Sequence, residues 1–215
     1  EENIALNVLN TILGGSMSSR LFIQVRERRG LAYSIHSGSE NYRDAGHVYV
    51  RAGLEGKNVN KAIQVIKQEI EKIKTKGVTS RELEDAKTHL RGRITLSMEN
   101  SSAQASWYAG QALFMKDIET PEQRLSRIDN VTKEQITALA KKVFSMNKMR
   151  VSIIGDLEKD NVKFYNGYYI NLDKILFTEM GIFIDNNECI KINLVNKFKT
   201  IQFMKKELTT KQINE

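Results

Sequence analysis

The composition of the chain changes abruptly at Gly155, and this change limits what the chain can fold into. Residues 1–155 contain 12 arginines and many alanines, whereas residues 156–215 contain neither arginine nor alanine. Helix-forming residues give way to isoleucine, tyrosine and phenylalanine, which favour strands. We therefore predict two modules, one over residues 1–155 and a small β-rich one over residues 156–215.

Apolar residues recur at helical spacing along most of the first module. The clearest run extends from Val59 to Ile73, keeps a period of 3.6 residues and stops at Gly77. Thr79 with Glu82 forms a capping box that opens the next helix. A further helix is predicted from Ala5 to Gly14-Gly15, where the chain would leave the helix through a left-handed turn. Other helices are predicted from the serines after that turn to Gly30, over about residues 101–115, and after Thr120 and Thr132.

Strands are fewer and lie far apart in the sequence. Residues 31–37 and 48–52 are short, partly alternating runs on either side of a polar stretch, and residues 150–154 form a third run that ends at Gly155. Many helices with few strands predict an α+β domain in which helices pack on a mostly antiparallel sheet. For residues 156–215 we predict a small antiparallel meander with a hairpin turn at residues 185–188.

The net charge of +7 raises the question of a nucleic-acid partner. Residues 1–155 hold 24 basic and 17 acidic residues, and residues 156–215 hold 9 of each. The basic excess is spread over helices that also carry acids, which is typical of a solvated surface. No run of 18 apolar residues is present, and the single cysteine, Cys189, suits a reducing compartment. We expect a cytoplasmic protein, or a mitochondrial matrix protein if eukaryotic, that binds neither nucleic acid nor membrane.

The histidines do not form a recognisable metal site. His36, His47 and His89 lack the spacing that places two imidazoles and a glutamate on one helical face. Cys189 has no second thiol or histidine near it in the sequence. We therefore expect that this chain does not ligate zinc and does not catalyse a reaction alone.

Two adjacent segments carry a family resemblance. Residues 14–22 read Gly-Gly-Ser-Met-Ser-Ser-Arg-Leu-Phe, and residues 25–35 read Val-Arg-Glu-Arg-Arg-Gly-Leu-Ala-Tyr-Ser-Ile. This order resembles the second domain of pitrilysin and insulinase-type zinc metallopeptidases, the group that includes the mitochondrial processing peptidase. The resemblance extends over about residues 1–155, and the first strand expected of the domain would precede residue 1.

The resemblance implies a function for the first module. In that family two similar α+β domains close like a clamshell on an unfolded peptide, and one half carries zinc on an inverted His-x-x-Glu-His motif. The other half contributes an arginine and, seven positions later, a tyrosine, which correspond here to Arg26 and Tyr33. The chain would then be the substrate-binding half of a zinc endopeptidase. Its partners would be a zinc-bearing domain or subunit and a peptide substrate.

Other interpretations stay open at this stage. From the residues alone, Arg26 could complement a helix C-terminus and Tyr33 could be a half-buried strand residue. A scaffolding or core-type subunit of the same family would have the same fold, and a basic nucleic-acid-binding protein is a third hypothesis. Retention of both Arg26 and Tyr33 favours the peptidase function over scaffolding.

Overall fold

The computed structural model describes residues 2–42, 45–155, 167–171, 191–192 and 201–202. By their internal packing the residues fall into two compact units, 1–146 and 147–215, and we treat each by itself.

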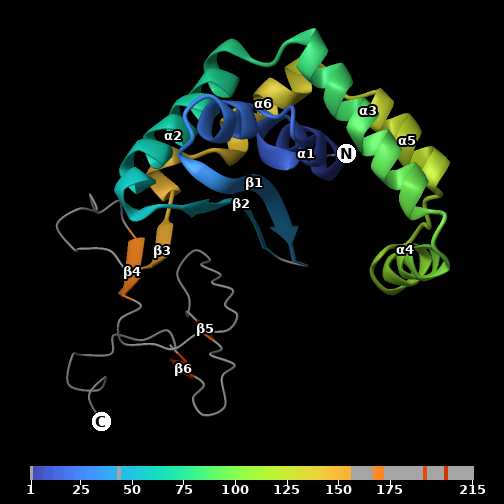
Figure 1. The fold of residues 1–215 in the computed structure, drawn as a ribbon. Helices are drawn as coiled ribbons and strands as arrows, with labels where there is room; N and C mark the ends of the chain where they lie inside the picture. Colours follow the sequence, from blue (N-terminus) through green and yellow to red (C-terminus); the bar gives the residue numbers. More distant parts are fainter. Residues whose placement is uncertain (1, 43–44, 156–166, 172–190, 193–200, 203–215) are drawn as a thin grey trace. The chain divides into compact units, whose positions relative to one another are not determined.

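The first unit is helix-rich and contains one two-stranded sheet in its described part (Figure 1). This arrangement confirms the predicted α+β class with helices packed on an antiparallel sheet. In chain order the elements are α1 (Glu2–Asn10), η1 (Thr11–Gly15), η2 (Phe22–Glu27), β1 (Ala32–Asn41), β2 (Gly46–Leu54), η3 (Gly56–Asn58), α2 (Val59–Lys76), α3 (Ser80–Ser97), α4 (Ser101–Phe114), α5 (Pro121–Asp129) and α6 (Lys133–Val143).

The helix starts follow the local capping chemistry that the sequence predicts. The side chain of Thr79 accepts from the Glu82 amide while the Glu82 side chain bonds back to Thr79, and Thr132 does the same with Gln135. Thr120 caps α5, which has proline at its start. Each cap satisfies donors that the first helical turn would otherwise leave unpaired.

The turn at Gly14-Gly15 differs from its prediction. We expected a left-handed exit from the helix, but positive φ angles occur among the described glycines only at Gly30, with φ 57°, and Gly77, with φ 72°. Gly14 instead lies in the π-helical turn η1, where a Cβ atom would come within 2.6 Å of the backbone nitrogen of Ser37. The prediction of a left-handed turn was therefore wrong, because the glycine is needed for close packing of η1 on β1.

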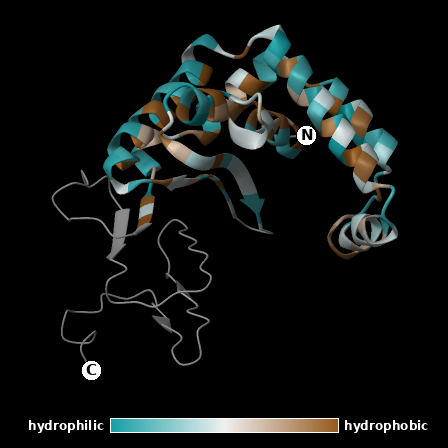
Figure 2. Ribbon diagram, viewed as in Figure 1, coloured by the Kyte–Doolittle hydropathy of each residue, from teal (hydrophilic) through white to brown (hydrophobic). Residues whose placement is uncertain are grey.

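The core of the first unit joins the N-terminal helix, the hairpin and the long helices. Its largest fully buried side chains are Leu9, Leu13, Leu21, Ile73, Ile136, Val8 and Val25. Apolar colouring gathers where α1, α2 and α6 face one another (Figure 2). Because α1 and η2 both contribute fully buried residues, the segment that leads to Arg26 is anchored on its inner side.

Arg20 ties the start of this segment to the junction between α2 and α3. Its guanidinium donates to both carboxylate oxygens of Glu82, at 2.5 and 2.9 Å, and to the carbonyl of Gly77 at 3.0 Å. Burial alone would raise the pKa of Glu82, but hydrogen bonds from Arg20 and Thr79 together outweigh it and hold that pKa below its ordinary value. This mostly buried fork fixes the position of η2 relative to the long helices.

The hairpin has a polar face and a face that packs on the core. Strands β1 and β2 pair antiparallel, with His36 opposite Arg51 and Gly38 opposite Tyr49. Ile35 and Ser37 are buried, while the intervening His36 is exposed. The strands are longer than predicted, because the polar stretch after Ser37 continues the ladder up to the pair Asn41–Gly46.

In the second unit, β3 (Val151–Gly155) pairs in parallel with β4 (Gly167–Asn171), and β5 (Lys191–Ile192) pairs antiparallel with β6 (Ile201–Gln202). The predicted hairpin turn at residues 185–188 lies outside the described residues, as does most of the predicted meander. Strand β3 was expected to close the first module, and in the structure it pairs with β4. A module boundary at residue 155 stays a prediction.

Candidate functional site

Arg26 lies in the last turn of η2, on the exposed side of that π-helical segment. Its guanidinium carbon lies 4.8 Å from the centre of the Phe22 ring, within cation–π range. No acidic side chain of the described residues forms an ion pair with Arg26. The N–H groups of the Arg26 guanidinium therefore stay available to donate hydrogen bonds to a bound peptide or other acceptor.

The turn that follows places Tyr33 close behind η2 in the chain. The Gly30 amide donates to the Arg26 carbonyl at 3.0 Å, and the Leu31 amide donates to the Val25 carbonyl at 2.9 Å. Gly30 has a positive φ of 57°, which glycine adopts without strain, and it directs the chain from η2 into β1. Arg26 and Tyr33 thus stand on the two sides of one tight, hydrogen-bonded connection.

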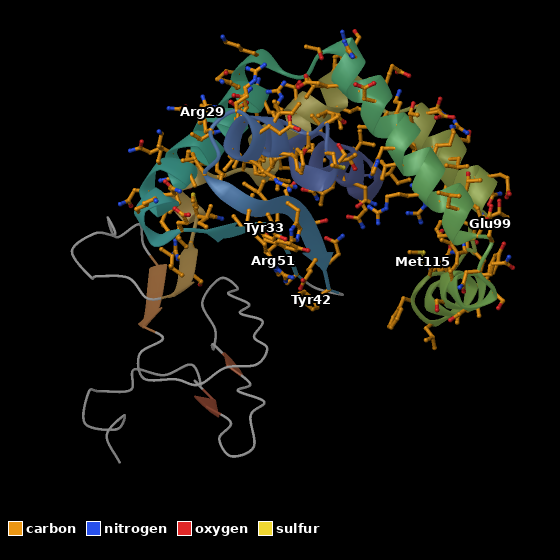
Figure 3. All side chains as sticks on the ribbon, in the orientation of Figure 1. Arg29, Tyr33, Tyr42, Arg51, Glu99 and Met115 are labelled. Atoms are coloured by element: carbon orange, nitrogen blue, oxygen red, sulfur yellow. The ribbon has the colours of Figure 1, made fainter. Side chains whose placement is uncertain are left out.

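Tyr33 projects into solvent at the start of β1. Its side chain is 87% exposed, which rules out the half-buried strand role considered from the sequence. The register of the hairpin shifts between Ala32 and Ser34, so that Tyr33 lies opposite no residue of β2. Such irregularities re-aim side chains out of a regular ladder. Figure 3 shows Tyr33 at one end of the hairpin and Tyr42 toward the other, with Arg51 between them.

A hollow of about 480 Å³ opens beside Tyr33. Its lining comes from the start of β1, from the end of β2 and from Asn58 at the end of η3. Arg26 does not line it. The structure therefore places Tyr33 at the mouth of a concave surface and Arg26 on the preceding helical segment.

The sheet register also brings together residues that the sequence analysis did not single out. His36, Tyr49, Arg51, Glu40 and His47 lie on the same side of the hairpin as Ser34, and we call this set the outer hairpin face. The Arg51 guanidinium carbon lies 4.5 Å from the centre of the Tyr49 ring, and His36 meets that ring edge-on at 6.1 Å. Alternation in both strands could have indicated this face, but only the register aligns the two strands.

The described residues contain no group of three or more histidine, cysteine, aspartate or glutamate side chains that could hold a metal ion. His36 and His47 lie on the outer hairpin face, and His89 lies on α3. This part of the chain therefore does not fit a zinc site. Among the same residues, no helix is long and apolar enough to cross a membrane.

An α+β unit of helices packed on an antiparallel hairpin is the fold that this chain shares with a peptidase domain of known structure. Residues 1–90 match the family model described as the peptidase M16 inactive domain. The chain therefore carries an inactive domain of the M16 family, and this confirms its resemblance to the pitrilysin-type metallopeptidases.

Relatives and solved structures agree with this assignment. An uncharacterized zinc protease of Bacillus subtilis is 34% identical over 140 residues, which is 65% of this chain and 34% of that protein. The crystal structure of a protein from Enterococcus faecalis has a TM-score of 0.59 at 32% identity, covering 66% of this chain and 33% of that one. A peptidase M16 inactive domain from Pseudomonas fluorescens has a TM-score of 0.57 at 26% identity, covering 67% and 34%. The chain spans about a third of the length of these proteins.

Proposed function

We propose that this chain is the substrate-binding half of a zinc-dependent endopeptidase and that it acts together with a zinc-bearing domain or subunit. The match to an inactive domain supports a non-catalytic role for the chain by itself. The relatives named as zinc proteases support a metal in the complete protein, held by residues outside the described part of this chain. The bacterial relatives favour a location outside mitochondria.

The exposure of Tyr33 is the observation that carries the proposal. A tyrosine that is 87% exposed contributes little to the core, yet a local irregularity of the strand directs it outward. When a peptide carbonyl is attacked, negative charge develops on its oxygen, and a positioned hydroxyl donor stabilises that charge. Tyr33 can supply such a donor at the mouth of the hollow.

Arg26 would act beside it as a planar donor to peptide carbonyls. Packing on Phe22 holds the guanidinium in place without using its N–H groups. The segment that carries Arg26 is anchored at its start by the bonds of Arg20 to Glu82 and Gly77. A donor on a fixed segment loses less conformational freedom when substrate binds.

The outer hairpin face would extend this surface along the peptide. Its aromatic and cationic side chains lie on the same hairpin as Tyr33 and already contact one another. Tyrosine and arginine are the residue types that most often carry binding energy at interfaces. A flexible peptide could therefore lie along β1, with its scissile bond near Tyr33.

The test combines this chain with the part of the Bacillus subtilis relative that lies outside the matched region, and follows hydrolysis of fluorogenic peptides with zinc present. Tyr33→Phe removes only a hydroxyl, so we expect kcat to fall about 100-fold while KM changes little. Arg26→Lys keeps the charge but loses the planar fork, and we expect both kcat and peptide binding to suffer.

A matched variant separates a site effect from a general one. Arg28→Lys changes an exposed arginine two positions beyond Arg26. It should keep activity near that of the parent. Full activity of Tyr33→Phe would contradict the assignment of Tyr33 to the substrate site. A loss of activity that follows a lower melting temperature would contradict it too.

A scaffolding subunit of the same family remains the second candidate. The match to an inactive domain suits assembly as well as it suits peptide binding. The two functions separate in the experiment above. A scaffolding subunit would give a stable complex whose activity, if any, does not depend on Arg26 or Tyr33.

A further inference from the structure

Helix α4 differs from the other long helices of the first unit in what surrounds it. It lies beyond the ends of α3 and α5, away from α1, α2 and α6 (Figure 1). Its only buried residue is Gln111. A helix in this position keeps most of its surface exposed.

The contacts that α4 does make are polar and lie on one side. Gln111 exchanges hydrogen bonds with the backbone of Glu119, and the Trp107 indole donates to the same Glu119 carbonyl at 2.9 Å. Asn100 caps the helix start by accepting from two backbone amides. These bonds hold the helix in a defined position relative to the start of α5.

The C-terminal end of α4 is apolar and open to solvent. Leu113 is 76% exposed and Phe114 is 84% exposed, and Met115 and Ile118 extend the exposed apolar surface beyond the helix. At 100° per residue, Ala109 lies about 40° from Leu113 around the helix axis, and Ala112 and Phe114 lie about 100° from it on either side. Ser102 and Ser106 lie below Leu113 nearer the helix start, so the apolar surface belongs to the last turns of the helix. We define the α4 apolar face as Ala109, Ala112, Leu113 and Phe114. Figure 2 shows the apolar colouring at this end of α4, and Figure 3 marks Met115 there.

No charged residue occurs in α4, whereas 27% of the whole chain is charged. Exposed helices in soluble proteins normally carry charged residues on their solvent side. A fixed helix with a contiguous bare apolar surface marks a protein–protein contact. The alanines beside Leu113 leave room for a partner to approach the helix backbone closely.

We infer that the α4 apolar face docks against the zinc-bearing half of the peptidase. This inference rests on the proposed function. The matched relatives are about three times as long as their matched region, so most of such a protein lies outside the part that this chain represents. A second copy of the chain is a weaker candidate, because each copy carries a net charge of +7 and would repel the other at low salt.

The direct test measures binding of the full chain to the zinc-bearing part of the Bacillus subtilis relative, by calorimetry or surface capture at physiological salt. Leu113→Glu and Phe114→Glu would each place a charge inside the contact, and we expect dissociation constants at least about tenfold higher than the parent's. Met17→Glu is the matched control, because Met17 is 74% exposed on a different segment. It should bind within about twofold of the parent.

Both α4 variants alter exposed side chains, so their circular dichroism and melting temperatures should match those of the parent. Three outcomes overturn the inference: no binding of the zinc-bearing part, equal loss with Met17→Glu, or sedimentation showing that the chain self-associates through Leu113 and Phe114 instead. The test also separates the two proposals. Tyr33→Phe should bind the partner normally and lose turnover, whereas Leu113→Glu should regain turnover when the partner is supplied in excess.

Discussion

The two ends of α3 face different environments. Near its start, Leu83 and Ala86 are buried in the core, and Glu82 takes part in a largely buried network with Arg20. Toward its end, Leu96 is 67% exposed, and Arg91 pairs with Asp129 at the surface. One helix thus joins a packed region to an exposed arm that ends in α4. The comparison teaches that the free energy of unfolding should respond strongly to changes in the first half of α3 and weakly to changes in its second half.

The largest expected effect comes from matched leucines on α3. Leu83 is 6% exposed, so Leu83→Ala should leave a cavity and lower the free energy of unfolding by about 3 kcal/mol. Leu96→Ala should change it by less than about 0.5 kcal/mol, because that side chain is already in water. Urea unfolding of both variants measures the difference. Equal losses would mean that the two ends of α3 are packed alike.

A second comparison uses the two arginine–carboxylate pairs. Arg20→Gln removes bonds to Glu82 and Gly77 within a mostly buried site, and we expect a loss of about 2 kcal/mol. Arg91→Gln breaks a pair that is about half exposed on both sides, and we expect at most about 0.5 kcal/mol. Thermal melts at pH 7 would show which of the two variants loses more stability. The comparison fails if Arg91→Gln costs as much as Arg20→Gln.

The dependence of stability on pH sharpens the same comparison. Because the folded-state pKa of Glu82 lies below its unfolded value, the unfolded carboxyl takes up its proton first as the pH falls. The stabilising contribution is therefore complete above about pH 5 and is lost as the pH drops through the folded-state pKa. The stability difference between the parent and Arg20→Gln should shrink from pH 6 to pH 3. A difference that stays constant would show that Arg20 acts by packing alone.

The smallest effect is expected from the end of the chain. The described core lies within residues 1–146, so truncation near residue 160 should leave the helical circular dichroism and a cooperative melt of the first unit in place. This also tests the predicted module boundary at residue 155. An insoluble product, or one without a cooperative melt, would show that residues 161–215 are needed for the core.

Local signals account for what could be predicted about the fold. The capping boxes at Thr79 and Thr132, the proline start at residue 121 and the glycine stops at Gly30 and Gly77 all appear as expected. Each depends on residues within about one turn, so that neighbouring side chains are enough to decide the conformation. The interpretation of Gly14 was wrong, because glycine is required there by the close approach of Ser37, which lies 23 positions away in the sequence.

The sequence by itself determined the helices, the two strands of the hairpin and the class of domain, because periodicity and caps are properties of adjacent residues. The family resemblance singled out Arg26 and Tyr33, and their role stays a prediction. Only the tertiary structure decided that Tyr33 is exposed beside a hollow and that Arg20 reaches Glu82, 62 positions away. It also decided that the α4 apolar face is exposed to solvent. Burial and long-range pairing depend on how whole elements pack, and no local pattern specifies that arrangement.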